Sequence, residues 1–299
     1  MVITDLLNNI LRGDAKAIAR SISLVENESD GYEHLLGSLP VSATPVIGIT
    51  GPPGAGKSTL TDALISNIVK DDKQVAVLCV DPSSPFNLGA LLGDRIRMSE
   101  WYDHPQVYIR SLATRGSLGG LHPKIIEITE LLKAAPFDYI IVETVGVGQS
   151  EIEIAGLADC TVVVLVPEAG DEVQTMKAGL MEIADIFVVN KSDRPEADLF
   201  VKNLRTMLAP AFHSNTQDIP VLKTIASRQE GVSDLWKAVN DHLRQQHGPQ
   251  QKAWLFTEKA WQLIQQNKMK HLDKNHLKNE IEQLMQQGKF NLYQFIKAY

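Results

Sequence analysis

Short apolar runs alternate with amphipathic stretches from Pro45 to about His242. The runs are mostly four to six residues long, rich in Val and Ile, and mostly bounded by Gly, Pro or Asp. Such runs are typical of strands buried on both faces, and amphipathic stretches between them predict helices that connect parallel strands. The predicted strands cover residues 46–49, 75–80, 139–142, 161–166, 186–189 and 221–224. The pattern therefore predicts an α/β fold with a mostly parallel, doubly wound sheet.

Helical periodicity marks both ends of the chain. In the first forty residues the apolar positions with helical spacing are Leu6, Leu7, Ile10, Leu11, Ile18, Ile22 and Val25. A Gln-rich linker at 244–252 is followed by a tail with the pattern of two or three amphipathic helices. We expect an N-terminal helical extension (1–40), a central α/β domain (41–245) and a C-terminal helical arm (246–299). The arm carries a heavy apolar load, so it either folds back on its own domain or pairs with a second copy, and we expect a homodimer.

A phosphate-binding loop follows the first predicted strand. Its sequence fits the pattern G-x-x-x-x-G-K-S between a strand and a helix, which is the context that this motif requires. The glycines let backbone N–H groups converge on phosphate oxygens at a helix N-terminus, and the lysine reaches the β- and γ-phosphates. The residues of the loop are Gly51, Pro52, Pro53, Gly54, Ala55, Gly56, Lys57, Ser58 and Thr59. The chain is therefore predicted to be a P-loop NTPase.

A second motif selects the base. Asn190, Lys191 and Asp193 form N-K-x-D at the end of the strand predicted at 186–189. An aspartate there accepts hydrogen bonds from N1–H and the amino group of guanine, whereas adenine presents a lone pair at N1. A further base contact through the backbone is expected from Thr224, Ile225 and Ala226. The motif predicts GTP and GDP as the ligands.

Acidic residues at strand ends indicate a magnesium site. Glu143 ends the strand predicted at 139–142, and Asp81 ends the one at 75–80, with Asp94 thirteen residues later. With the hydroxyl of Ser58 they offer the oxygen ligands that Mg²⁺ prefers. Asp94 also fits the pattern of a helix N-cap, so both interpretations remain open for it.

The loop after Glu143 is suited to sensing the γ-phosphate. Gly146 is placed so that its N–H can contact that phosphate, and the second glycine of the loop allows it to rearrange when the phosphate leaves. Gln149 is the candidate for orienting the attacking water. A GTPase site that lacks an effective water-orienting group hydrolyses GTP slowly until a partner protein completes the site.

Net charge and cysteine content indicate which binding partners and which cellular compartment to expect. The formal net charge of -7 argues against a nucleic-acid or anionic-membrane surface, since both require a basic field. The N-terminus lacks the pattern of a signal peptide, and no apolar stretch approaches the ~20 residues that cross a bilayer. Cys79 and Cys160 lie in or beside predicted strands and are interpreted as inert core residues. A cytoplasmic protein is expected.

Several long strings resemble one family. The strings VDPSS…LGDRIRM, RSLATRGSLGGL, ETVGVGQSE and PEAGDEVQTMKAGLMEIADIFVVNKSD are similar to the MeaB/ArgK/MMAA-like GTPases, which have glutamate at the magnesium carboxylate. The resemblance implies a G-protein chaperone of an adenosylcobalamin-dependent acyl-CoA mutase, with methylmalonyl-CoA mutase as the first candidate, and implies a C-terminal dimerisation arm. It also implies that the loop with Asp171 and Lys177 is a third switch that meets the mutase. The chain departs from the family at 85–89, where a Thr-Gly-Gly stretch is common.

Two other functions are compatible with parts of the sequence. A metal-insertion GTPase of the hydrogenase or urease maturation type would share the fold, but the first forty residues contain one histidine, His34, and no cysteine to hold a metal. A transport-associated, ATP-dependent kinase would share the phosphate loop, but the motif that ends at Asp193 favours guanine. Both remain alternatives to the mutase chaperone.

Overall fold

The computed structural model describes residues 3–81, 98–115, 121–146, 150–169, 183–208, 219–245, 249–269 and 272–299. The chain divides into two compact units, Met1–His247 and Gly248–Tyr299. The first unit holds the sheet, and the second is helical. No helix within the described ranges is long and apolar enough to cross a membrane.

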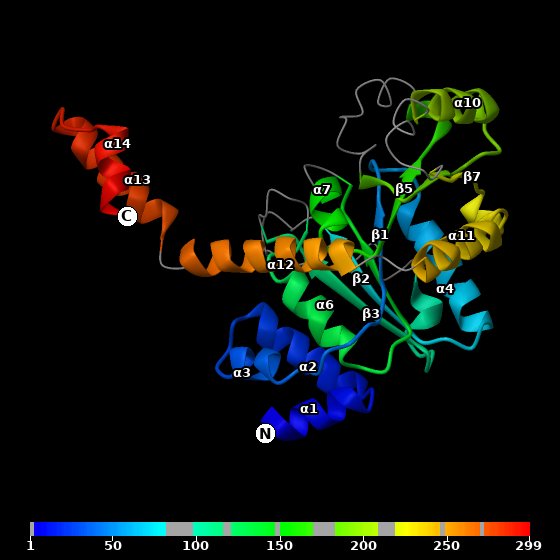
Figure 1. Ribbon diagram of the computed structural model, residues 1–299, viewed down its shortest axis with the longest axis horizontal. Coiled ribbons are helices and arrows are strands. Elements are labelled where there is room, and N and C mark those ends of the chain that lie inside the picture. Colours follow the sequence, from blue (N-terminus) through cyan, green and yellow to red (C-terminus); the bar gives the residue numbers. More distant parts are fainter. Residues whose placement is uncertain are drawn as a thin grey trace. The chain divides into compact units, whose positions relative to one another are not determined.

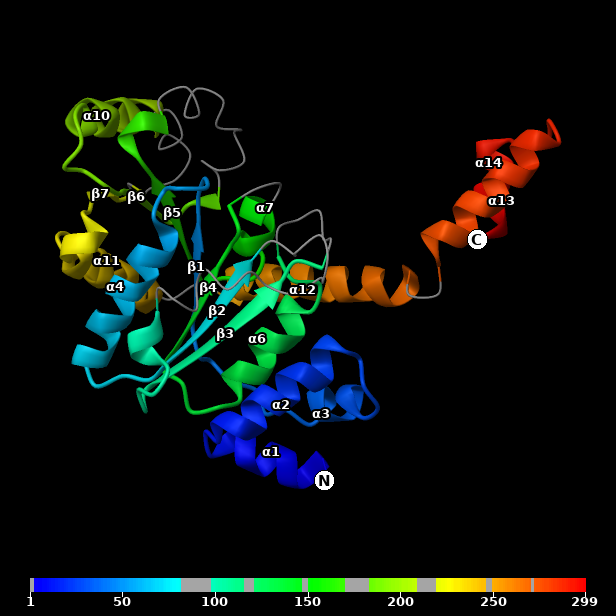
Figure 2. The same cartoon turned by 180° about the vertical axis from the view of Figure 1, so that it is seen from behind.

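A seven-stranded parallel sheet forms the centre of the first unit (Figures 1 and 2). Its strands are β1 (Val46–Thr50), β2 (Val75–Asp81), β3 (Val107–Ala113), β4 (Tyr139–Glu143), β5 (Cys160–Leu165), β6 (Ile186–Val189) and β7 (Val221–Lys223). Their order is β3-β2-β4-β1-β5-β6-β7, and each neighbouring pair is parallel. The predicted α/β class and parallel sheet are confirmed. The sequence pattern missed β3, because this edge strand is only partly buried and includes the polar residues Arg110 and Ser111.

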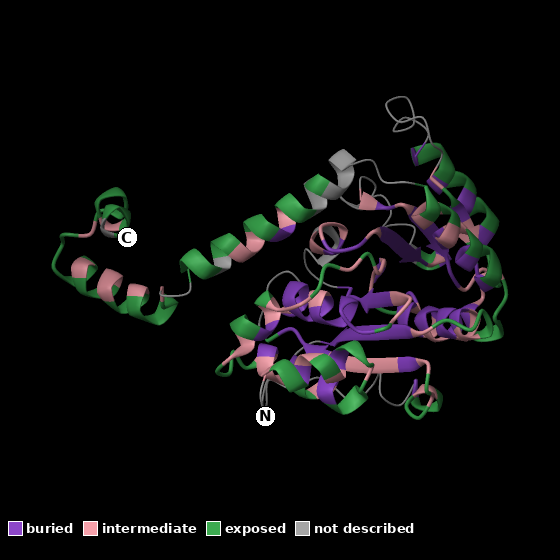
Figure 3. Ribbon diagram, turned by 60° about the horizontal axis from the view of Figure 1, so that its bottom comes forward, coloured by how far each residue is buried: buried purple, intermediate pink, exposed green. Residues whose placement is uncertain are grey.

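Helices cover both faces of the sheet, and the strand residues divide between them by alternation. On one face, α4 (Lys57–Lys70) and α11 (Val232–Arg244) pack against each other and against the strands. Ile47, Val77 and Val188 belong to the apolar cluster on this side. On the other face lie α6 (Ile125–Lys133), α7 (Ser150–Ala155) and α10 (Ala197–Leu208). The central strands are thus buried on both sides, which explains their continuous apolar sequence (Figure 3).

The N-terminal extension is helical as expected, and it forms part of the first unit. Its helices are α1 (Ile3–Leu11), α2 (Ala15–Glu26) and α3 (Tyr32–Gly37). The helix α2 packs on α6 and buries Ile18, Ile22 and Val25, the positions that helical periodicity selects. At its end, Glu26 forms an ion pair with Arg110 of β3 at 2.5 Å.

The second unit consists of α12 (Pro249–Met269), α13 (Lys274–Gln286) and α14 (Leu292–Phe295). The predicted linker at 244–252 is too long, because α12 begins inside it at Pro249. A proline fits the first turn of a helix, where its missing N–H costs no intrahelical bond. Several large apolar side chains of this unit are more than half exposed: Phe256, Trp261, Ile264, Met269, Met285, Leu292, Tyr293, Ile296 and Tyr299.

Candidate functional site

The phosphate loop joins β1 to α4 and is held in a shape that requires glycine. Gly56 directly precedes α4 and has φ +88°, a conformation that residues with a side chain rarely adopt. A Cβ atom at this position would lie 2.5 Å from the side-chain nitrogen of Asn190. The guanine motif therefore packs directly against the phosphate loop, and the glycine makes that approach possible.

Lys57 is buried at the start of α4. Its ammonium group donates to the carbonyl oxygens of Gly51 at 2.9 Å and Pro52 at 3.2 Å, and lies 3.5 Å from that of Val145. These carbonyls come from the phosphate loop and from the segment after β4. The same ammonium would lie 2.4 Å from a Cβ atom at Gly146. Lys57 and Gly146 are thus neighbours, as a joint contact with a γ-phosphate requires.

Glu143 ends β4 and is buried against two hydroxyl groups of α4. The hydroxyl of Ser58 donates to one carboxylate oxygen at 2.6 Å, and that of Thr61 lies 2.9 Å from the other. The Ser58 hydroxyl and the Glu143 carboxylate therefore bring oxygen atoms together at one place. The contact with Thr61 was not predicted, although its place one turn after Lys57 and Ser58 on α4 puts it on the same face of the helix.

Asp81 lies beside Glu143 at the carboxyl edge of the sheet. The strands β2 and β4 are paired with Cys79 opposite Glu143, and Asp81 is the second residue after Cys79. Asp81 is also buried. The groups gathered here are two carboxylates and a hydroxyl, a donor set of hard oxygens that fits Mg²⁺. Asp94 lies outside the described residues.

Asn190 connects three segments of the site. Its side-chain amide donates to the carbonyl oxygen of Ala55 at 2.9 Å, which joins it to the phosphate loop. Its side-chain oxygen accepts from the hydroxyl of Thr224 and the N–H of Ala226, each at 3.1 Å. Lys191 adds a second link to the loop, because its ammonium donates to the carbonyl oxygen of Gly54 at 2.8 Å. The residues predicted to hold the phosphates and the base therefore form one bonded assembly.

A cavity of about 240 Å³ opens beside this assembly. It is lined by Gly56, Thr59, Asn190, Lys191, Asp193, Arg194, Ile225, Ala226 and Ser227. The cavity is smaller than the roughly 300–1,000 Å³ of pockets that enclose whole ligands, which suits a site for one part of a nucleotide. The sequence analysis did not identify Arg194 and Ser227 as site residues. The one feature of the sequence that could have indicated them is that each directly follows a predicted site residue.

The segment expected to contact the base is already hydrogen-bonded within the protein. The N–H of Thr224 donates to the carbonyl oxygen of Val189, and that of Ile225 donates to Glu230, both at 3.0 Å. The N–H of Ala226 donates to Asn190. Ile225 and Ala226 both line the cavity, and a guanine carbonyl that bonded the N–H of Ala226 would share this donor with Asn190.

Other predicted residues lie outside the described parts of the chain. They are Gln149, Asp171 and Lys177. The start of the predicted third switch is described: Glu168, in the short helix Pro167–Ala169, forms an ion pair with Arg194. Because Arg194 directly follows Asp193, this ion pair connects the two segments.

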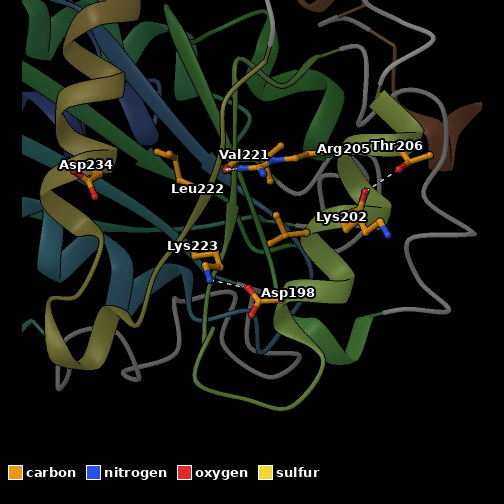
Figure 4. Close-up of a pocket in the computed structure, with 9 residues that line it drawn as sticks. Asp198, Lys202, Arg205, Thr206, Val221, Leu222, Lys223 and Asp234 are labelled. Atoms are coloured by element: carbon orange, nitrogen blue, oxygen red, sulfur yellow. Dashed lines mark hydrogen bonds and ion pairs between the residues drawn. The ribbon is translucent and has the colours of Figure 1, made fainter.

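A larger hollow of about 780 Å³ lies between α10 and the edge strand β7 (Figure 4), and none of its lining residues belongs to the phosphate loop or the N-K-x-D motif. Two of its basic side chains are engaged: Lys223 pairs with Asp198 at 2.8 Å, and Arg205 donates to the carbonyl oxygen of Val221 at 3.2 Å. These contacts cover the open edge of β7. The hollow therefore does not compete with the motif-lined cavity as the nucleotide site.

Comparison with proteins of similar sequence and fold identifies the family of this chain. The family model for "Methylmalonyl Co-A mutase-associated GTPase MeaB" matches residues 18–281. The chain belongs to the MeaB family. As a member of it the chain is a GTPase, which agrees with the phosphate loop and the guanine motif and confirms the predicted resemblance, activity and nucleotide class.

Individual relatives extend this result. A protein of Pyrococcus abyssi is 47% identical over 246 residues, which are 81% of this chain and 76% of that protein. The fused isobutyryl-CoA mutase of Geobacillus kaustophilus is 36% identical over 273 residues, which are 86% of this chain and 25% of that protein. The crystal structure of an LAO/AO transport system kinase superposes with a TM-score of 0.66 at 24% identity, covering 99% of this chain and 95% of the other, which shows that the fold is shared.

Proposed function

We propose that this MeaB-family GTPase is a chaperone that gates cofactor loading and protects an adenosylcobalamin-dependent acyl-CoA mutase, with methylmalonyl-CoA mutase as the first candidate. The observation that carries the proposal is the fused isobutyryl-CoA mutase. One segment of that mutase polypeptide is similar to 86% of this chain. Fusion holds two modules at a high effective concentration, so it is favoured where they act together. The description of the family points to the same class of partner.

The described side chains suit the binding of GTP with magnesium. Ser58, Asp81 and Glu143 would hold the ion, which neutralises charge on the β- and γ-phosphates when bound. Lys57 would exchange its carbonyl contacts for charge-assisted hydrogen bonds to phosphate oxygens. Asp193, on the rim of the cavity, would read the guanine edge. The hydrogen bonds from Asn190 and Lys191 to the phosphate loop support this arrangement.

Slow hydrolysis by the chain alone follows from the same proposal. Lys57 and Glu143 stabilise charge but do not orient water, and the third switch with Asp171 and Lys177 would be completed by the mutase. The ion pair between Glu168 and Arg194 gives this loop a direct link to the guanine segment. A partner that orders the loop can therefore influence the nucleotide.

The experiment is a GTPase assay with and without purified methylmalonyl-CoA mutase. We expect the mutase to raise the rate of the wild type, and Asp171→Ala and Lys177→Ala to keep the basal rate but lose the increase. The variant Lys223→Ala, which removes a cation from the unrelated hollow at β7, is the control and should be stimulated fully. If the mutase leaves the wild-type rate unchanged, the proposed partner is wrong.

We also propose that the C-terminal arm forms a two-fold homodimer. On α12 the side chains of Phe256, Trp261 and Ile264 are each more than half exposed, which is a large apolar surface for a single helix. Pairing with a second copy would remove this surface from water. Sedimentation of the full chain should give a dimer and a truncation after His247 a monomer. A truncated chain that still sediments as a dimer would contradict the proposal.

A further inference from the structure

Three side chains with metal-ligating atoms meet at the edge of the sheet opposite the phosphate loop. Cys160 is the first residue of β5, Asp185 directly precedes β6, and His242 lies in the last turn of α11. The thiol sulfur, a carboxylate oxygen and a ring nitrogen of these residues all lie within 4.8 Å of one another. We propose that Cys160, Asp185 and His242 form a binding site for a divalent transition metal, with zinc as the ion that suits them best.

The chemistry of the three groups favours zinc over magnesium. Zinc binds thiolate, imidazole and carboxylate ligands in tetrahedral geometry, and three protein ligands leave one position for water. Magnesium and calcium prefer oxygen ligands throughout, so a cysteine and a histidine select against them. This cluster therefore differs in kind from the oxygen-only group around Glu143.

The distances are close to those of a formed site. With bonds of about 2.0–2.3 Å, neighbouring ligand atoms of tetrahedral zinc lie about 3.3–3.8 Å apart. One pair already meets this condition, because Asp185 Oδ1 and His242 Nε2 are 3.5 Å apart. The other two pairs lie within 4.8 Å and need to close by at most about 1.5 Å, which side-chain rotations can supply.

The backbone holds Asp185 in the orientation of a ligand. The N–H of Thr161 donates to Asp185 Oδ2 at 2.7 Å, and the N–H of Asp185 donates back to the carbonyl oxygen of Thr161 at 3.0 Å. The carboxylate is thereby fixed with its other oxygen toward His242. Ligand carboxylates in metal sites are characteristically held by hydrogen bonds of this kind.

The charges of the cluster also fit a divalent ion. A free thiol carries its proton near neutral pH, and metal binding requires the thiolate. A divalent cation would replace that proton and balance the charges of one thiolate and one carboxylate, so binding should release one proton. Once bound, the ion would clamp the end of α11 to the first residue of β5 and to the residue that precedes β6.

The test uses Co²⁺ as a spectroscopic substitute for zinc on the full, tag-free chain after chelator treatment, with excess Mg²⁺ and GDP present. We expect one equivalent of Co²⁺ to give the thiolate-to-cobalt charge-transfer band and the intense visible bands of tetrahedral cobalt. Cys160→Ser should abolish the charge-transfer band, and His242→Gln should weaken Co²⁺ binding at least tenfold. The control Cys79→Ser removes the other buried cysteine and should leave the band unchanged.

Two results would overturn the proposal. One is a wild type that gives no charge-transfer band at millimolar Co²⁺, and the other is a band that survives in Cys160→Ser but disappears in Cys79→Ser. If Cys160→Ser does not fold, calorimetry of the wild type in buffers of different ionisation enthalpy decides the question. Release of about one proton per bound zinc supports a thiol ligand, and release of none contradicts it.

Discussion

The side-chain amide of Asn190 donates to the carbonyl oxygen of Ala55 at 2.9 Å and so joins the guanine motif to the phosphate loop. The two residues are 135 positions apart in the chain. Both residues are buried, so breaking this hydrogen bond would leave two polar groups without a partner away from water, which costs free energy. The segments predicted to read the base and to bind the phosphates are therefore joined by a buried hydrogen bond.

Replacing Asn190 should weaken both segments together. Asn190→Ala would leave the carbonyl oxygen of Ala55 and the N–H of Ala226 without their partner, at a cost of roughly 2–4 kcal/mol in the free energy of unfolding. We expect GDP as well as GTP to bind at least tenfold more weakly, as measured by calorimetry. Asn240→Ala is the control, because Asn240 also bonds a side chain and a backbone carbonyl but lies on α11. It should lose stability and keep its nucleotide affinity.

Glu143 contacts two hydroxyls of α4. Two substitutions of Glu143 can separate the structural role of these contacts from its proposed role in binding metal. In Glu143→Gln the amide oxygen can still accept from Ser58, while the amide N–H₂ can donate to Thr61, whose hydroxyl lies 3.0 Å from the carbonyl oxygen of Lys57. This variant should fold normally, need more Mg²⁺ for half-maximal activity, and hydrolyse GTP at least tenfold more slowly. Glu143→Ala should in addition be less stable, by about 1–3 kcal/mol. Equal hydrolysis rates and Mg²⁺ requirements in Glu143→Gln and the wild type would show that Glu143 is not part of a metal site.

Gly146 is predicted to tolerate no side chain. A Cβ atom there would lie 2.3 Å from the carbonyl oxygen of Gly51 and 2.4 Å from the ammonium of Lys57, and the backbone has φ +85°. Gly146→Ala should displace Lys57, reduce GTP affinity at least tenfold, and lower the free energy of unfolding by about 1–3 kcal/mol because of the strained backbone. Gly54→Ala serves as the comparison, because a Cβ atom would contact nothing within 4 Å although φ is also positive. A Gly146→Ala protein with wild-type GTP affinity would remove this residue from the site.

His122 should make stability depend on pH. Its ring is 1% exposed, and burial lowers its pKa from 6.5 to about 4. The carboxylate of Glu26 opposes this shift, whereas the positive groups of Arg115, Lys124 and Arg110 strengthen it. The unfolded chain therefore binds more protons between these two values. Stability contributed by the neutral ring is fully present above pH 6.5 and is lost as the pH falls toward 4, by roughly 2–3 kcal/mol.

The measurement is the free energy of unfolding in urea between pH 4 and 7.5. His122→Asn keeps an acceptor for the N–H of Lys124, which donates to Nδ1 of the ring at 3.0 Å, and should flatten the slope below pH 6.5. His104→Asn is a matched control, because the Nδ1 of His104 also accepts from an N–H two residues later. It should keep the slope of the wild type. Identical slopes in all three proteins would show that folding does not lower the pKa of His122.

The sequence predicts the parts of the structure that local pattern determines. Six of the seven strands follow from continuous apolar runs, and the phosphate loop and guanine motif follow from residue spacing. The edge strand β3 does not, since partial burial leaves polar residues such as Arg110 within it. Contacts made only by tertiary packing also escape prediction, and the approach of Thr61 to Glu143 is one example. The grouping of Cys160 with His242 is another, because it depends on how α11 crosses the sheet.

Titration of the wild type and Asp193→Asn with GTP, ATP and xanthosine triphosphate tests the central claim most directly, namely that the assembled loops form a guanine site read by Asp193. Asp193 lines the cavity beside Asn190 and Lys191. Guanine offers its carboxylate two donors, whereas xanthine has an oxygen at C2 that needs a donor from the protein. The wild type should bind GTP at least 100-fold more tightly than ATP or xanthosine triphosphate, and Asp193→Asn should prefer xanthosine triphosphate to GTP. Equal affinity of the wild type for GTP and ATP, or an Asp193→Asn variant that still prefers GTP, would contradict the account.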